Sequence, residues 1–139
     1  FGYRFKFKEI IFIWFSGILT LILVVNFLLK NMWGRVRPND ILEFGGKDFF
    51  TPWYKYSEAC ASNCSFVSGD SSVGFMLIIF YFLTKKNVYF YVSLCCGASL
   101  GFIRIIAGGH FFSDIIFSQL VVTSSLGALF FLYKRYYDK

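Results

Sequence analysis

Three short groups of charged and polar residues in this sequence could perform chemistry. In chain order they are Lys30-x6-Arg37-Pro38, Ser68-Gly69-Asp70 and Arg104-x5-His110-x3-Asp114. Together they hold three cations, two carboxylates and the only histidine of the chain. This set suits phosphoryl transfer, in which the transition state spreads negative charge over three oxygens and is stabilised by well-placed cations.

The cations and the small residues fit a phosphate-binding role. Arg37 and Arg104 offer planar pairs of N–H donors to phosphate oxygens, and Lys30 offers a mobile positive charge. Ser68 and Gly69 are predicted to open a helix, where free backbone N–H groups favour an anion. The missing side chain of Gly69 lets the backbone approach the phosphate closely.

His110 fits the role of the nucleophile. Its ring nitrogen would attack phosphorus and form a phosphohistidine, which water then hydrolyses. Asp114 follows four residues later, about one helical turn, so it can face His110 and hold the second ring nitrogen in the required tautomer.

Each candidate also has a structural interpretation that needs no reaction. Lys30 and Arg37 can be anchors that extend to the membrane surface. Ser68 can be a simple N-cap, and Asp70 can stabilise the first turn of a helix. A lone histidine is commonly structural, but the place of His110 between an arginine and an aspartate favours function.

The composition indicates a membrane protein. The 139 residues are 57% hydrophobic and 23% aromatic, and only 16% are charged, whereas a soluble domain carries about 25% charged residues. Too few polar side chains remain to cover a surface in water, and such hydrophobicity also excludes a disordered chain. The net charge of +6 then marks the cytoplasmic ends of membrane spans. We therefore expect no nucleic-acid partner.

Four charge-free runs predict an all-α integral membrane bundle of four transmembrane helices, forming one domain over residues 1–139. The runs cover residues 10–29, 71–84, 87–103 and 115–133. The second run is too short to span the bilayer unless protein shields its start. Small residues in the third run, Gly97, Ser99 and Gly101, predict close contact between helices. Residues 30–66 form a long loop, which usually carries function or short structure of its own.

The charges of the connections orient this bundle. Four spans place both termini and the turn at residues 85–86 on one side, which carries eight lysines and arginines against two carboxylates. The other side, with the long loop, carries six of each sign. Because cytoplasmic segments carry the excess of lysine and arginine, we expect cytoplasmic termini. The three polar groups then lie together on the outer face, where ionisable residues at membrane depth indicate a functional site.

The order and spacing of the three groups resemble the type 2 phosphatidic acid phosphatase (PAP2) family of membrane lipid phosphatases. The family pattern is Lys-x6-Arg-Pro, then Pro-Ser-Gly-His, then Ser-Arg-x5-His-x3-Asp, and the match runs from Lys30 to Asp114. Gly34-Arg35-x-Arg37-Pro38 followed by residues 63–70 is similar to a bacterial subset that includes lipid A 1-phosphatases. The resemblance implies phosphate-binding roles for Lys30, Arg37, Ser68, Gly69 and Arg104 and catalytic roles for His110, Asp114 and Asp70.

The resemblance also implies what the protein acts on and where. It implies hydrolysis of a lipid phosphate, through a phosphohistidine and without a metal or cofactor, on the periplasmic face of a bacterial inner membrane. A lipid A-like glycolipid is the favoured substrate, with undecaprenyl diphosphate and phosphatidylglycerol phosphate as competitors. The alternative is a non-catalytic, truncated membrane protein that retains a cradle for lipid phosphate. An anion-channel subunit is a third hypothesis, but it does not explain the pair of His110 and Asp114.

The sequence departs from the family pattern at three positions. Val67 replaces a proline, Ile103 replaces a serine, and Asp70 replaces a histidine that protonates the leaving group. An ordinary aspartic acid titrates near 3.9 and a histidine near 6.5, so an aspartate is the poorer proton donor at neutral pH. Three interpretations stay open. An anomeric phosphate or a diphosphate needs less protonation, or Asp70 orients a cation while water protonates, or activity is impaired.

The family core has six transmembrane helices, and this chain starts at the equivalent of the third. We therefore expect a fragment or the product of a truncated gene. Cys60 and Cys64 lie on the predicted outer side, where an oxidising periplasm permits a disulfide, but their short separation leaves the pairing open. A metal site built on these two cysteines would need further ligands, and only His110 is available, so no metal is expected. The sequence predicts no oligomeric state.

Overall fold

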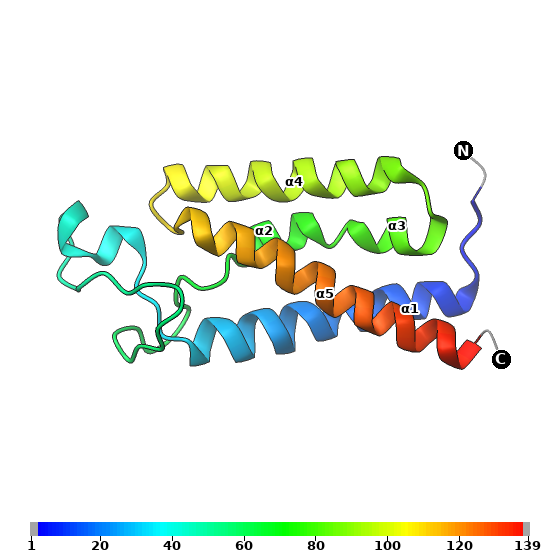
Figure 1. Ribbon diagram of the computed structural model, residues 1–139, viewed down its shortest axis with the longest axis horizontal. Helices are drawn as coiled ribbons and strands as arrows, with labels where there is room; N and C mark the ends of the chain where they lie inside the picture. The colour runs from blue at the N-terminus through cyan, green and yellow to red at the C-terminus, as the bar shows by residue number, and fades with distance from the viewer. Residues whose placement is uncertain (1–2, 138–139) are drawn as a thin grey trace.

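The computed structural model describes residues 3–137, and within this range the chain is helical and contains no β-strand. In chain order the main helices are α1 (Phe7–Ile18), the π-helical η1 (Leu19–Lys30), α2 (Gly69–Phe75), α3 (Ile78–Thr84), α4 (Asn87–Ile106) and α5 (Phe112–Tyr137). They pack side by side as a bundle (Figure 1). The long loop lies at one end of the bundle, and α1 begins and α5 ends at the other.

The predicted all-α membrane fold is confirmed. Phe7–Lys30, Asn87–Ile106 and Phe112–Tyr137 are long and apolar enough to cross a membrane, and Gly69–Thr84 is a shorter apolar segment. Apolar side chains cover the outside of the bundle, as lipid contact requires: Trp14, Ile22 and Phe102 are 69%, 62% and 63% exposed. The helices extend past the charge-free runs, because polar residues at a membrane surface can continue a helix.

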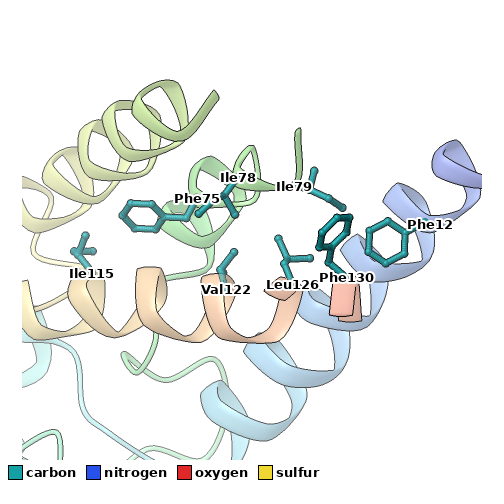
Figure 2. Packing of buried hydrophobic residues seen from close by; sticks show 8 residues of the cluster. All are labelled: Phe12, Phe75, Ile78, Ile79, Ile115, Val122, Leu126 and Phe130. Carbon is teal, nitrogen blue, oxygen red and sulfur yellow. The ribbon is translucent and has the colours of Figure 1, made fainter. Parts of the chain in front are cut away.

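The inside of the bundle is an apolar cluster contributed by α1, α2, α3 and α5. Its buried members, drawn in Figure 2, are Phe12, Phe75, Ile78, Ile79, Ile115, Val122, Leu126 and Phe130. A smaller cluster of Val25, Phe66 and Val67 lies under the loop. Close packing of these side chains fixes the helices relative to one another, and therefore fixes the loop-side ends on which the polar groups stand.

Two glycines allow α2 and α4 to approach closely. A Cβ on Gly74 would stand 2.6 Å from the Cα of Gly97, so neither position has room for a side chain. The hydroxyl of Ser71 donates a hydrogen bond of 2.7 Å to the carbonyl oxygen of Gly97. Gly101 is likewise buried against Ile115. The predicted helix contact is thus present at Gly97 and Gly101, whereas Ser99 is exposed.

The long loop has short structure of its own and holds the turn between α4 and α5. It contains two 3-10 turns, η2 (Pro38–Asp40) and η3 (Leu42–Phe44). The backbone N–H of Asn39 donates to the carbonyl oxygen of Gly108 at 3.1 Å, and its side-chain amide donates to that of Ala107 at 3.0 Å. The loop therefore fixes the segment that leads into His110.

Candidate active site

The side chain of His110 is 1% exposed and its tautomer is set by a backbone carbonyl. Nδ1 lies 2.7 Å from the carbonyl oxygen of Ser65. A carbonyl oxygen can only accept, so Nδ1 carries the hydrogen and donates it. In the neutral ring this leaves a lone pair on Nε2. Nε2 is thus the ring nitrogen whose lone pair is not taken up by this hydrogen bond.

Asp114 is fully buried in the first turn of α5, and every contact of its carboxylate is a charged or polar donor. Its Oδ1 accepts from Nη1 of Arg35, and its Oδ2 accepts from the hydroxyl of Ser65 at 2.5 Å and from the N–H of Phe111 at 2.9 Å. Oδ2 is 3.6 Å from Nδ1 of His110, beyond hydrogen-bond distance. The carbonyl oxygen of Ser65 therefore accepts the hydrogen bond from Nδ1 that the sequence predicts for Asp114, whose carboxylate lies near the ring without bonding to it.

Arg35 was not among the residues predicted to bind or react, yet its side chain is only 2% exposed. Besides Asp114, it donates to the carbonyl oxygen of Thr51 at 2.9 Å and to the hydroxyl of Ser113 at 2.8 Å. Its guanidinium carbon lies 4.2 Å from the ring centroid of Phe111. Burial lowers the pKa of Arg35, and the adjacent carboxylate opposes this shift. The signal in the sequence was an arginine two residues before Arg37.

Lys30 and Gly69 come together although they stand in different groups of the sequence. A Cβ on Gly69 would lie 3.5 Å from Nζ of Lys30 and 4.0 Å from Oδ1 of Asn26. The absent side chain therefore leaves space directly beside the ammonium. Ser68 is buried and caps α2, with its hydroxyl accepting from the N–H of Ser71 at 3.4 Å.

Asp70 and Arg104 join the second group to the third. Nε of Arg104 lies 3.0 Å from Oδ2 of Asp70, with side chains that are 35% and 59% exposed. Within the described part of the chain this Nε has no partner with hydrogen-bond geometry, so the contact is an ion pair only. Nη2 of Arg104 stands 3.0 Å from the point that a Cβ of Gly109 would occupy. The guanidinium therefore lies against the residue that precedes His110.

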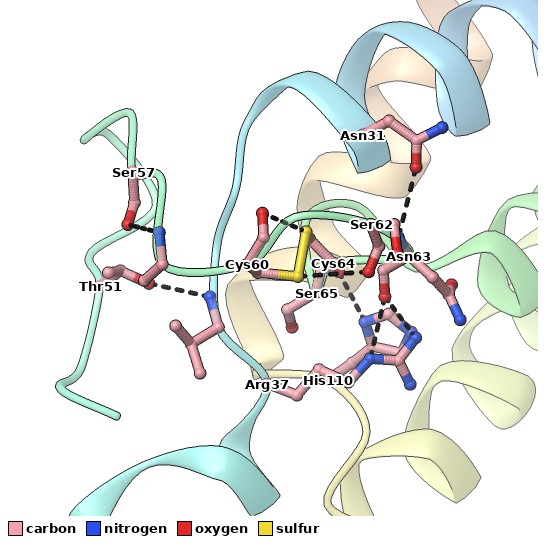
Figure 3. Close-up of a disulfide and its surroundings, with 12 residues drawn as sticks. Asn31, Arg37, Thr51, Ser57, Cys60, Ser62, Asn63, Cys64, Ser65 and His110 are labelled. Atoms are coloured by element: carbon pink, nitrogen blue, oxygen red, sulfur yellow. Dashed lines mark hydrogen bonds between the residues drawn. A yellow bond between two sulfur atoms is a disulfide. The ribbon is translucent and has the colours of Figure 1, made fainter. Parts of the chain in front are cut away.

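Arg37 is held by the segment around a disulfide (Figure 3). Its Nε and Nη2 donate to the carbonyl oxygen of Asn63 at 3.2 and 2.7 Å. Cys60 and Cys64 are bonded, which answers the pairing that the sequence left open. One short segment thus supplies the carbonyl that holds Arg37 and, at Ser65, the carbonyl that holds His110.

The structure therefore brings the three predicted groups to one end of the bundle. The charge of Lys30 interacts with those of Arg37, Asp70 and Arg104. Asp114 is not part of this cationic surface, because it lies buried with Arg35. Among residues 3–137 no three histidine, cysteine, aspartate or glutamate side chains gather as a metal-binding group. The arrangement can hold a phosphate between cations beside a histidine whose tautomer is fixed.

The sequence also resembles proteins of a known family. Residues 11–138 match the sequence profile of the PAP2 superfamily. A lipid A 4′-phosphatase of Francisella tularensis subsp. novicida is 42% identical over 117 residues, which are 81% of this chain and 53% of that protein. Lipid A 4′-phosphatases of Rhizobium leguminosarum and Rhizobium etli are 36% and 37% identical over 114 residues, 78% of this chain and 49% and 44% of theirs. The chain thus spans about half the length of these relatives. No solved structure matches it.

Proposed function

The chain belongs to the PAP2 superfamily, and on that premise we propose that it is a membrane lipid phosphatase acting on a lipid A-like glycolipid. Three relatives named lipid A 4′-phosphatase support this class of substrate. These relatives are named for the phosphate at position 4′ of lipid A, whereas the sequence motifs resemble phosphatases that act at position 1. They do not favour the alternative of a non-catalytic cradle.

The hydrogen bond from His110 to Ser65 is the observation that carries this proposal. It leaves the Nε2 lone pair free to attack phosphorus, so that an N–P bond forms as the P–O bond to the lipid breaks. Water then attacks phosphorus, inorganic phosphate leaves, and the electron pair returns to Nε2. The buried charge of Asp114 would stabilise the positive charge that the ring gains when Nε2 bonds to phosphorus, as a carboxylate stabilises an imidazolium in other histidine-dependent enzymes.

Lys30, Arg37 and Arg104 would hold the phosphate oxygens during both steps. Gly69 has no side chain beside the Lys30 ammonium, so a phosphate bound by Lys30 can approach the backbone there, and Ser68 fixes the start of α2 next to it. Three cationic side chains supply the charge stabilisation that a metal ion supplies in other phosphoryl-transfer sites. We therefore infer hydrolysis without a metal or cofactor.

Asp70 is proposed to orient Arg104 rather than to donate a proton. Its carboxylate is exposed and paired with that guanidinium. When a phosphate is removed from a non-anomeric carbon, the leaving group is the oxygen of an ordinary alcohol, and this oxygen must be protonated. Water at the exposed position of Asp70 can supply the proton. A cavity of about 340 Å³ beside the pair is lined by Val73, Leu100 and Ile103, and its apolar wall suits the lipid part of a substrate.

The proposed orientation has the site on the periplasmic face of a bacterial inner membrane and the termini in the cytoplasm. The surplus of lysine and arginine on the side of the termini supports it. The disulfide between Cys60 and Cys64 supports it as well, because disulfides persist in oxidising compartments and this one lies on the loop side.

Mass spectrometry of lipid A from bacteria that express the full-length gene tests the function. We expect the loss of one phosphate with the wild-type protein and none with His110→Ala. A Ser99→Ala variant, altered at an exposed position of α4, should act like the wild type. If lipid A and phospholipids stay unchanged while both proteins insert into the membrane, the non-catalytic alternative replaces this proposal.

A further inference from the structure

A cavity of about 400 Å³ lies at the end of the bundle remote from His110. It is formed where α1 begins, α3 turns into α4, and α5 ends (Figure 1). The charged side chains in its wall are Lys6, Lys8, Lys85, Lys134 and Glu9. Among the described residues, Lys6, Lys8 and Lys85 therefore bring ammonium groups to a space that is large enough for a phosphate and its ester.

Glu9, the carboxylate that the described residues contribute to this wall, is already engaged. Oε1 of Glu9 accepts from the hydroxyl of Tyr3 at 2.6 Å, and Oε2 accepts from the backbone N–H of Lys6 at 2.8 Å. Nζ of Lys85 lies 4.9 Å from the ring centroid of Phe130. Aromatic faces attract ammonium groups only weakly at exposed sites, so this contact leaves the Lys85 ammonium able to bind an anion.

An apolar groove of about 280 Å³ continues from this cavity between α1 and α5. The two spaces share Lys8, Tyr133 and Tyr137. The rest of the groove is apolar, and its members Phe15 and Leu132 are 60% and 59% exposed on the membrane-spanning helices. A cationic cavity that opens into an apolar groove matches the two parts of a phospholipid, whereas a soluble phosphate would use only the first.

We propose that this joined cavity and groove bind one anionic phospholipid from the leaflet on the side of the termini. Its phosphate lies among Lys6, Lys8 and Lys85, and one acyl chain lies along the groove. Anionic headgroups attract nearby lysines, and the acyl chain removes exposed apolar surface from other contacts. The site is separate from the phosphatase centre, so it stands whether or not the chain hydrolyses lipid A.

Native mass spectrometry of the full-length protein in a neutral detergent tests this site. The probes are phosphatidylglycerol, phosphatidylcholine and glycerol phosphate, each added separately. The variant is Lys8→Gln with Lys85→Asn, because asparagine tolerates the left-handed backbone of Lys85, where φ is 58°. Lys86→Gln is the matched control, since Lys86 is the exposed neighbour that does not line the cavity. The single variant Lys8→Gln is measured as well, in case the double variant is unstable.

We expect the wild type and the Lys86→Gln control to retain one phosphatidylglycerol. The double variant should bind it at least about tenfold more weakly, because two lysines near the headgroup are lost. The affinity of Lys8→Gln should lie between those of the wild type and the double variant. Phosphatidylcholine and glycerol phosphate should bind weakly to all of them. Equal retention of phosphatidylcholine, equal binding of glycerol phosphate, or no difference between Lys8→Gln and the control would overturn the proposal.

Discussion

The guanidinium of Arg35 and the carboxylate of Asp114 form a buried ion pair between residues that are 79 positions apart in the chain. The pair ties the long loop to the first turn of α5. Ser65 donates to the same carboxylate and accepts from His110 through its carbonyl oxygen. The loop, the start of α5 and the proposed nucleophile therefore form one connected polar network behind the phosphate-binding surface.

Removing Arg35 should be costly. Arg35→Met leaves the Asp114 charge buried and unpaired, and we expect the free energy of unfolding to fall by about 3–5 kcal/mol. Arg35→Lys should recover only part of this, because one ammonium cannot replace the contacts with Thr51 and Ser113. Denaturant unfolding in detergent measures the effect. Arg4→Met, at an exposed position, is the control, and equal stability of Arg35→Met and Arg4→Met would refute the network.

Changing Asp70 should affect substrate binding more than turnover. Asp70→Asn weakens the ion pair with Arg104, so we expect KM to rise and kcat to fall less than about tenfold, whereas losing a general acid costs about 10²–10⁴. Asp70→His should keep activity or raise it towards simple alcohol phosphates. Phosphate release against substrate concentration separates kcat from KM. A kcat loss of a hundredfold or more in Asp70→Asn would make Asp70 the proton donor.

Breaking the disulfide should loosen the segment that holds Arg37 and His110. We expect Cys60→Ser with Cys64→Ser to lower the free energy of unfolding by about 2 kcal/mol, the entropy cost of a loop this short, and to reduce phosphatase activity. Adding dithiothreitol to the wild type should have the same effect. The double variant should not respond to dithiothreitol. A similar response in both proteins would mean that dithiothreitol acts on something other than this disulfide.

The contact between α2 and α4 should not tolerate a methyl group. Gly74→Ala places a Cβ 2.6 Å from the Cα of Gly97, and we expect a loss of about 1–3 kcal/mol in the free energy of unfolding. Gly127→Ala is the matched control, since its Cβ would meet only Cζ of Phe82 at 3.7 Å. It should be neutral or stabilising, by up to about 1 kcal/mol. Equal melting temperatures for both variants would mean that α2 and α4 can separate freely.

The sequence could predict the helices and the meeting of the three polar groups, because both depend on local patterns. Charge-free runs of the right length predict membrane helices, and spacing along the chain places Lys30, Asp70 and Arg104 on the same side. The division of residues 69–84 into α2 and α3 was not predicted, since nothing in the composition at Met76 and Leu77 marks it. The single domain over residues 1–139 stays a prediction.

The rest of the site depends on contacts that have no local signature. His110 is oriented by a backbone carbonyl, which every residue carries, so nothing in the sequence singles out Ser65. Arg35 was noticed only as part of Gly34-Arg35-x-Arg37-Pro38 and received no role, because a charged residue in a loop is ordinarily solvated. Only the folded loop shows that it is buried against Asp114 and Phe111.

In the proposed reaction, His110 carries the phosphate between the lipid and water. Full-length protein would be mixed with lipid A that bears a radioactive phosphate, quenched in alkali during turnover, and digested for peptide mass spectrometry. We expect label on the peptide containing His110, stable to alkali and lost in acid, and we expect neither label nor turnover with His110→Ala. Turnover without label at His110, or wild-type turnover by His110→Ala, would contradict it.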